Sequence, residues 1–178
     1  MGAQKIPNLV YSFAPIINAK SKILILGSLP SVMSLSKGQY FANPKNQFWT
    51  IIYRVFEESV VDVEYEDRIK FLLEHGIALW DVFQLAEREG SSDAKIKNGT
   101  PNNITGLLRG YPGIKRIVVA GGKAATAFRS YFPEVAVEVV NVPSTSPIPG
   151  KNIKTLEEKT QIWRRAIRER VGENYEDC

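Results

Sequence analysis

The chain has 178 residues, of which 44% are hydrophobic, 24% charged and 10% aromatic, and this length fits one domain with a full core. Its formal net charge is +4, so the protein is basic without being a polycation. The only cysteine is Cys178 and the only histidine is His75, which excludes an internal disulfide and a cysteine or histidine metal cluster, and disfavours a Ser-His-Asp triad.

The sequence has no apolar run near the ~20 residues that span a bilayer. Its N-terminus also lacks the hydrophobic segment of a signal peptide. We therefore expect a cytoplasmic protein that does not bind membranes. One domain is expected to span residues 1–178, with residues 172–178 as a flexible acidic tail.

Short apolar runs alternate with helical patterns along the chain. In chain order, these patterns predict a strand over Lys22–Gly27, helices over Asn46–Phe56 and Asp67–His75, a strand over Ile77–Val82, a helix over Asn103–Leu108, a strand over Arg116–Gly121, a helix over Lys123–Phe132, a strand over Val137–Val142 and a last helix over Thr155–Val171. His75, next to Gly76, is expected to cap its helix. Alternating strands and helices predict an α/β protein, a three-layer α/β/α sandwich with a central, mainly parallel four-stranded sheet.

Ligands of such folds bind beyond the carboxyl ends of the strands. The segments expected there are Gly27–Trp49, Asp81–Pro101, Gly121–Ala125 and Pro143–Asn152. The first and the last of these are much longer than the ~2–6 residues of ordinary α/β loops. We therefore expect the functional site in these long loops.

The segment Gly121-Gly122-Lys123 ends a strand and opens a helix, as a phosphate-binding loop does. A P-loop needs a glycine five positions before the Gly-Lys pair and a hydroxyl residue after it, whereas this chain has Ile117 and Ala124 there. The glycines are better explained by close packing of the helix on the sheet, with an anion contact at the helix start as the alternative. The missing phosphate signatures also disfavour a flavodoxin-like nucleotide binder.

The late loop Ser144-Thr145-Ser146-Pro147 has no GxSxG motif around it, which disfavours a serine hydrolase. Small hydroxyls, a rigid proline, the apolar Ile148 and the nearby Lys151 match a DNA-backbone contact with an inserted wedge, although a polar turn is the default interpretation. Residues 151–170 also hold seven basic residues against three acidic ones. This excess suits a polyanion partner, or else a solvated helix face.

The early segment YFANPKNQFW places large aromatic side chains in a loop. Phe48 fits the apolar face of the following helix, whereas Tyr40 and Phe41 precede that helix and need another explanation. A flat pocket wall that stacks on a planar base is one such explanation. Asn43 and Asn46 would place amides near that wall, where an amide accepts from water or donates to a base edge but is not a strong base.

Taken together, GSLPS, YFANPKNQFW and VPSTSP resemble motifs of the uracil-DNA glycosylase superfamily, and most of all its hypoxanthine (deoxyinosine) DNA glycosylase branch. The middle segments ALWDVFQLAEREGSSDAKIKNGTPNNI and IVVAGGKAATAF are similar to the same branch. The similarity runs from about Tyr11 to Ile167, and it is the combination of motifs that is specific.

This resemblance implies monofunctional removal of a deaminated base from DNA in base-excision repair, with the base flipped into a pocket and without a metal or cofactor. Asn46 matches the catalytic residue, and Phe41 matches the aromatic side chain that stacks on the base. The substrate-binding positions implied are Gly27, Ser28, Leu29, Pro30, Ser31, Phe41 and Asn43. The DNA-binding positions implied are Ser144, Thr145, Ser146, Pro147, Ile148 and Lys151, with Ile148 as the intercalating wedge. The expected partner is DNA that contains a deaminated base, bound by a monomer.

The chain departs from the family pattern at positions that bear on base preference. Leu29 stands where other branches carry a catalytic Asp or Asn, which argues against an ordinary uracil-specific enzyme. Ile148-Pro149 replaces the Ala-Asn that usually follows STSP, Ala120 replaces an asparagine, and Asn43 stands where histidine is common.

Hypoxanthine is therefore the expected substrate, and two alternatives stay open. One is a glycosylase for uracil in G:U mismatches, and the other is a nucleic-acid-binding homologue without turnover. Glycosidic cleavage through an oxocarbenium-like state needs charge stabilisation on the departing base and a held water, not a strong nucleophile. Asn46 suits either water positioning or a hydrogen bond to the base.

Overall fold

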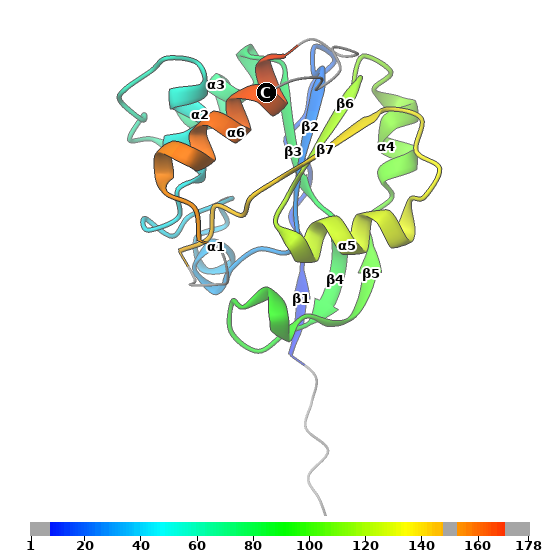
Figure 1. Cartoon of the computed structure of the whole chain (residues 1–178). Helices are drawn as coiled ribbons and strands as arrows, with labels where there is room; N and C mark the ends of the chain where they lie inside the picture. Colours follow the sequence, from blue (N-terminus) through cyan, green and yellow to red (C-terminus); the bar gives the residue numbers. More distant parts are fainter. Residues whose placement is uncertain (1–7, 148–152, 170–178) are drawn as a thin grey trace, which may run out of the picture.

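The computed structural model describes residues 8–147 and 153–169. A four-stranded sheet with strand order β3-β2-β6-β7 lies at its centre (Figure 1). The strands are β2 (Ile23–Gly27), β3 (Ile77–Asp81), β6 (Arg116–Ala120) and β7 (Glu138–Val142), and all neighbouring pairs are parallel. These are the four strands that the apolar runs predict, and the predicted sheet is confirmed.

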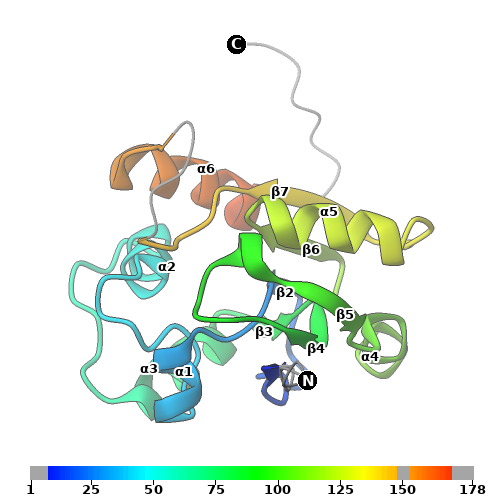
Figure 2. The same ribbon diagram turned by 90° about the horizontal axis from the view of Figure 1, so that it is seen from below.

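Helices cover both faces of this sheet because its side chains alternate between two cores (Figure 2). Ile25 of β2 packs with α2 (Phe48–Val55), α3 (Tyr65–Glu74) and α6 (Leu156–Arg168) on one face. Its neighbours Leu24 and Leu26 pack with α4 (Ile104–Gly110) and α5 (Gly122–Tyr131) on the other. The predicted three-layer sandwich is confirmed by this arrangement.

The helix ends follow local capping chemistry. His75 is the C-cap of α3, where its Nδ1 lies 2.8 Å from the Phe71 carbonyl oxygen, so the predicted capping role is confirmed. Thr155 and Glu158 form a capping box at the start of α6. This helix ends at Arg168, and its C-cap Glu169 is extended, so the predicted end at Val171 was wrong. The predicted tail 172–178 lies outside the described residues, so the single domain over residues 1–178 stays a prediction. None of the described helices is both long and apolar enough to cross a membrane.

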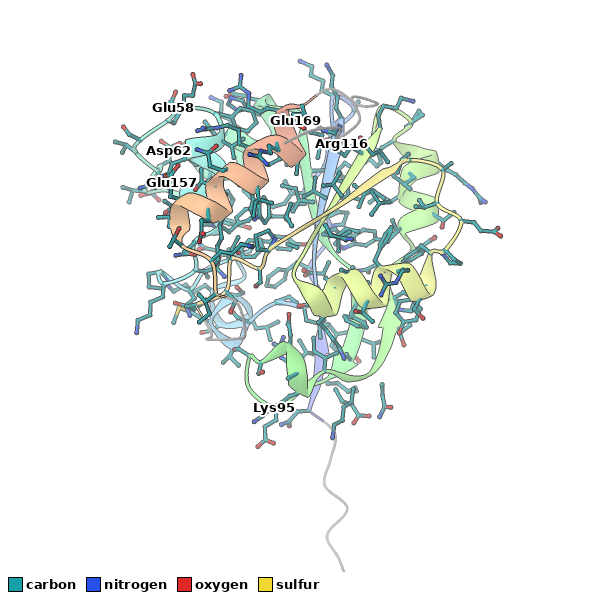
Figure 3. All side chains as sticks on the ribbon, viewed as in Figure 1. Glu58, Asp62, Lys95, Arg116, Glu157 and Glu169 are labelled. Carbon is teal, nitrogen blue, oxygen red and sulfur yellow. The ribbon has the colours of Figure 1, made fainter. Side chains whose placement is uncertain are left out.

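The amino end of β6 is tied to the elements around it by Arg116, which is buried (Figure 3). Its Nε donates to Glu138 Oε2 of β7 at 2.5 Å, and its Nη1 donates to the Ala166 and Glu169 carbonyl oxygens at the end of α6. This guanidinium therefore fixes the carboxyl end of α6 against the amino ends of β6 and β7. That end of the sheet lies opposite the long loops.

The chain continues from β3 directly into a second sheet, which the apolar runs do not predict. It is antiparallel with order β1-β4-β5, formed by β1 (Leu9–Tyr11), β4 (Phe83–Glu87) and β5 (Lys97–Pro101), with the 3₁₀ turn η1 (Asp93–Lys95) between the last two. The segment Asp81–Pro101 was expected beyond the carboxyl ends of the strands, but no strand was predicted after Val82 within it. The reason is that β5 has the sequence KNGTP, which carries no apolar pattern and is held by backbone pairing to β4.

The loop predicted over Gly27–Trp49 also contains a helix, α1 (Val32–Lys37). Ser31 caps its start by accepting from the Ser34 amide, and Gly38, at φ +63°, ends it. These caps are visible in the sequence, but the helix has only six residues and its apolar side chains Val32, Met33 and Leu35 are exposed. No amphipathic pattern marks such a helix.

Candidate functional site

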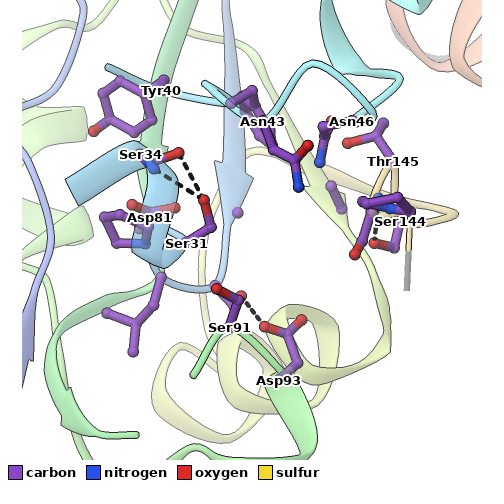
Figure 4. Close-up of a pocket in the computed structure, with 18 of the residues that line it drawn as sticks. Ser31, Ser34, Tyr40, Asn43, Asn46, Asp81, Ser91, Asp93, Ser144 and Thr145 are labelled. Atoms are coloured by element: carbon purple, nitrogen blue, oxygen red, sulfur yellow. Dashed lines mark hydrogen bonds between the residues drawn. The ribbon is translucent and has the colours of Figure 1, made fainter. Parts of the chain in front are cut away.

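A cavity of about 330 Å³ opens at the carboxyl ends of the parallel strands, at the low end of the range for small-ligand sites (Figure 4). Every described residue of the predicted site lines it: Gly27, Ser28, Leu29, Pro30, Ser31, Phe41, Asn43, Asn46, Ser144, Thr145, Ser146 and Pro147. The other predicted positions, Ile148 and Lys151, lie outside the described residues. Tyr40, for which a pocket wall was one explanation, and Ala120, which replaces an asparagine of the family pattern, line the cavity as well. So do residues that were not singled out for the site: Ser34, Asp81, Ser91, Ser92, Asp93 and Ala94.

The first motif leaves β2 at Gly27, which pairs with Asp81 of β3. A Cβ atom at Gly27 would lie 2.7 Å from Asp81 Oδ1, so a larger residue would displace that carboxylate. Further along, Ser28 Oγ donates to Asp93 Oδ1 at 2.6 Å, and the Pro30 carbonyl oxygen accepts from the buried Arg88. These bonds attach the first motif to the second sheet, which fixes one wall of the cavity.

We expect Gly27→Ala to destabilise the protein by about 1–3 kcal/mol, the cost of overpacking a filled site. Urea unfolding measures this loss. Gly122→Ala is the matched control, because no atom lies within 4 Å of its added Cβ and the residue opens α5, where alanine is a better helix former. Equal stability of the two variants would show that the contact with Asp81 Oδ1 relaxes freely.

The aromatic wall is formed by Phe41, whose φ of +52° is rare for a residue with a side chain. Strain of this kind costs about 1–3 kcal/mol and concentrates at functional sites. One face of the Phe41 ring stacks on Phe48, with ring centroids 3.9 Å apart and planes at 15°. Next to it, the Ala42 amide donates to Ser34 Oγ at 3.2 Å, and Ser34 is also bonded to Ser31 (Figure 4). The ring is thus held in place from behind while it lines the cavity.

Asn46 is oriented by the start of α2. Its Oδ1 accepts from the Phe48 amide at 2.9 Å, an Asx turn that satisfies the first N–H of the helix. Because that amide only donates, the contact identifies which end of the Asn46 side chain is oxygen. The side-chain nitrogen therefore points toward the cavity as a hydrogen-bond donor (Figure 4).

The second motif is held against the first. The Gln47 amide donates to the Thr145 carbonyl oxygen at 3.0 Å, and Lys159 Nζ of α6 donates to Gln47 Oε1 at 2.9 Å. On the other side, Gly121 has φ +89°, and an added Cβ would lie 3.2 Å from Ser144 Cβ. A glycine is therefore required at position 121, where the β6–α5 turn meets this loop. An added Cβ at Gly122 would have no atom within 4 Å, so the prediction that both glycines serve close packing of the helix on the sheet was wrong for this residue.

Asp81 is the acidic group at the end of β3, and its side chain is buried. Burial, and then the neighbouring Asp93, raise its pKa from 3.8 to about 7, while Arg88 opposes this rise. Arg88 itself donates from Nε to the Gly90 carbonyl oxygen at 2.8 Å, and burial lowers the pKa of its guanidinium. Across residues 8–147 and 153–169, no group of three or more His, Cys, Asp or Glu side chains could hold a metal ion.

The basic residues of α6 are used partly for structure. Arg164 Nη2 donates to the Arg54 carbonyl oxygen at 2.8 Å, and Arg168 Nη1 donates to that of Val55 at 3.3 Å. Cations near the carboxyl end of α2 satisfy its last carbonyl groups and complement its dipole. With Lys159 bonded to Gln47, three cations of this helix already have structural partners.

Known proteins resemble this chain over most of its length. The model of the uracil DNA glycosylase superfamily matches residues 14–167. Two relatives named hypoxanthine DNA glycosylase, from Methanosarcina acetivorans and Methanosarcina barkeri, are 34% and 33% identical over 156 residues, which cover 88% of this chain and 96% of each relative. The solution structure of a uracil DNA glycosylase candidate from Methanosarcina acetivorans matches with a TM-score of 0.77 and 33% identity, over 90% of this chain and 99% of that one.

Proposed function

This chain belongs to the uracil DNA glycosylase superfamily, and on that premise we propose that it is a DNA glycosylase of base-excision repair that removes hypoxanthine from DNA. The observation that carries the proposal is one cavity that is lined by every described residue of the predicted site, from both motifs. Hypoxanthine is the expected base because two relatives are named hypoxanthine DNA glycosylase. Leu29, whose side chain packs into a small core with Val10 and Phe83, offers no group for uracil-type catalysis.

The base is flipped out of the duplex and stacks on the cavity face of Phe41. Enzymes that act on a base within DNA must extrude it, because the stack hides the reacting atoms. Phe48 already covers the other face of the Phe41 ring, so a planar base would extend an existing stack. The Ser144–Pro147 loop beside it offers hydroxyls and main-chain amides to the flanking phosphates.

Asn46 donates a hydrogen bond from Nδ2 to the departing base. The bond between the sugar C1′ and the base nitrogen breaks, and negative charge develops on the base as the sugar becomes oxocarbenium-like. A fixed N–H donor stabilises this charge more in the transition state than in the ground state. A water oxygen then bonds to C1′, and its proton is left to the released base. With Asn46 Oδ1 engaged by the Phe48 amide, this donor role is favoured over water positioning.

Base release from matched oligonucleotides tests the function. Each strand carries one hypoxanthine, uracil or xanthine, single-stranded or opposite each normal base. We expect abasic product from hypoxanthine at the highest rate. Release from uracil alone would replace the hypoxanthine proposal with the uracil alternative. Saturable binding of damaged DNA with no release from any substrate would indicate a binding protein without turnover.

DNA binding is expected to weaken steeply with salt, because cations that contact phosphates release counterions. Lys151 is the cation that the second motif provides for this contact. Its replacement by glutamine should reduce the slope of log K against log salt by about 0.9. The control is Lys70→Gln on α3, which leads to the amino end of the sheet and pairs with Glu74. A slope that Lys151→Gln leaves unchanged would remove this residue from the interface.

We further propose that the protein acts as a monomer in the cytoplasm. The described residues of the predicted site, from both motifs, line one cavity within a single chain. Light scattering of the protein at working concentration tests the monomer, and a stable dimer would contradict it.

A further inference from the structure

Ser34 of α1 lines the cavity, and no step of the proposed mechanism uses it. The residue is only 2% exposed. Its Oγ accepts from the Ala42 amide at 3.2 Å, so the hydroxyl lies beside the main chain that directly follows Phe41. A base stacked on the Phe41 ring therefore brings one of its edges close to the Ser34 hydroxyl.

The hydrogen-bond capacity of this hydroxyl is filled on its acceptor side. Ser34 Oγ accepts from the Ala42 amide and from the Ser31 hydroxyl at 3.0 Å, and these two bonds occupy both of its lone pairs. Its own hydrogen remains, and none of the described residues accepts it. Buried donors nearly always have a partner, so a buried donor that lines a cavity is best explained by an acceptor on the ligand.

Ser34 and Asn46 lie on opposite sides of the cavity, and each offers it one donor (Figure 4). A ligand that uses both donors must carry acceptors on two opposite edges. Hypoxanthine, joined to the sugar through N9, has an unprotonated ring nitrogen on each edge, N7 on one and N3 on the other. Uracil has no such nitrogen, because its N1 carries the sugar and its N3 carries a hydrogen. The two donors therefore match a purine.

We propose that Ser34 donates a hydrogen bond to one of these two ring nitrogens while Asn46 donates to the other. Negative charge on the departing purine spreads over both rings and reaches N7 and N3, so each donor stabilises the transition state more than the ground state. The Ser34 amide donates to Ser31 Oγ at 3.1 Å, which polarises the Ser31 hydroxyl and, through it, the Ser34 hydroxyl. The hydrogen stays on Ser34 Oγ throughout. This inference rests on the proposed function and extends it to the purine class of substrate.

Two analogues of the base separate the two donors. In 7-deazahypoxanthine and in 3-deazahypoxanthine, one ring nitrogen is replaced by C–H and the rest of the base is unchanged. A site that hydrogen-bonds a substrate atom works poorly on an analogue that lacks this atom, because its own polar group is then unpaired. Loss of the Ser34 hydroxyl should therefore matter only for a base that retains its partner nitrogen, and a double-mutant cycle measures this coupling.

The experiment measures single-turnover release of hypoxanthine and of both analogues from duplex DNA. We expect Ser34→Ala to slow the release of hypoxanthine by at least about tenfold, the effect of one hydrogen bond to a charged group. It should leave the release of one analogue nearly unchanged. The other analogue should be the one that Asn46→Ala affects least. Ser36→Ala is the matched control, because Ser36 is exposed on the same helix, and it should release all three bases at wild-type rates.

Thermal melting confirms that each variant is folded. If an analogue is released too slowly to measure, the affinity of each variant for the same duplexes replaces the rate in the comparison. Equal slowing of all three bases by Ser34→Ala would mean that Ser34 acts only through the structure of α1. That result, or hypoxanthine release that Ser34→Ala leaves unchanged, would overturn the inference and leave the glycosylase assignment standing. Wild-type protein that releases no hypoxanthine would overturn both.

Discussion

Replacing Asn46 with alanine should lower the rate of hypoxanthine excision by at least about a hundredfold, the effect of removing one preorganised donor from a charge-stabilising site. The donor is Asn46 Nδ2, which faces the cavity because Oδ1 is bonded to the Phe48 amide. Single-turnover excision measures the rate, and fluorescence anisotropy measures DNA affinity. The affinity should be nearly unchanged, because the phosphates contact other residues. A fully active Asn46→Ala protein would exclude Asn46 from the mechanism.

Asn46→Asp is the control that separates structure from chemistry. A carboxylate oxygen still accepts from the Phe48 amide, so the start of α2 is preserved, whereas alanine removes this bond at a cost of about 0.5–2 kcal/mol. The carboxylate has no N–H to donate. We therefore expect the aspartate variant to be as slow as the alanine variant while it unfolds at the wild-type denaturant concentration. An active aspartate variant would support water positioning in place of donation to the base.

The second large effect is on stability as a function of pH. The pKa of Asp81 rises from 3.8 in the unfolded chain to about 7 in the folded protein, mainly through burial. Between these values the folded protein holds a proton that the unfolded chain has released, so stability falls as the pH increases through this window. A rise of this size corresponds to a loss of about 4 kcal/mol once the pH is well above 7.

Asp81→Asn cannot ionise and should escape this loss. Urea unfolding at about pH 5 and about pH 8.5 measures the free energy of unfolding of both proteins across the window. We expect the wild type to lose more stability than the variant over this interval. Asp93→Asn is the companion variant, because removal of the neighbouring charge lowers the pKa of Asp81 and weakens the effect. Parallel pH dependences of wild type and Asp81→Asn would show that Asp81 is not protonated in the folded state at neutral pH.

The central sheet and its five helices could be predicted from the sequence because their signals are local. A run such as ILILG is apolar throughout since both faces of β2 are covered, and α6 places Trp163 and Ile167 on one buried face. The second sheet carried no such signal. Its strand β5 is polar and held by backbone pairing, and the antiparallel pairing of β1 with β4 joins segments more than seventy residues apart.

The site, too, could be predicted from the sequence only in part. Motif residues from both ends of the chain line one cavity, as the resemblance implies, although their individual roles stay predictions. Asp81 and Asp93 lie in the middle segment that resembles the family, but each is a lone carboxylate there and neither was assigned a role. Their importance comes from contacts across the sheet, with Gly27 in one case and Ser28 in the other. A carboxylate directly after an apolar strand was the available signal for Asp81, since that position is at the ligand-binding edge.

The most direct test of a hypoxanthine DNA glycosylase is the identity of its products from a duplex that contains one deoxyinosine. Mass spectrometry should detect free hypoxanthine and, in equal amount, an abasic strand whose backbone is intact before alkali treatment. A cleaved strand that still carries hypoxanthine on its sugar would contradict the proposed reaction. An unchanged substrate that is fully bound by the protein would contradict turnover itself.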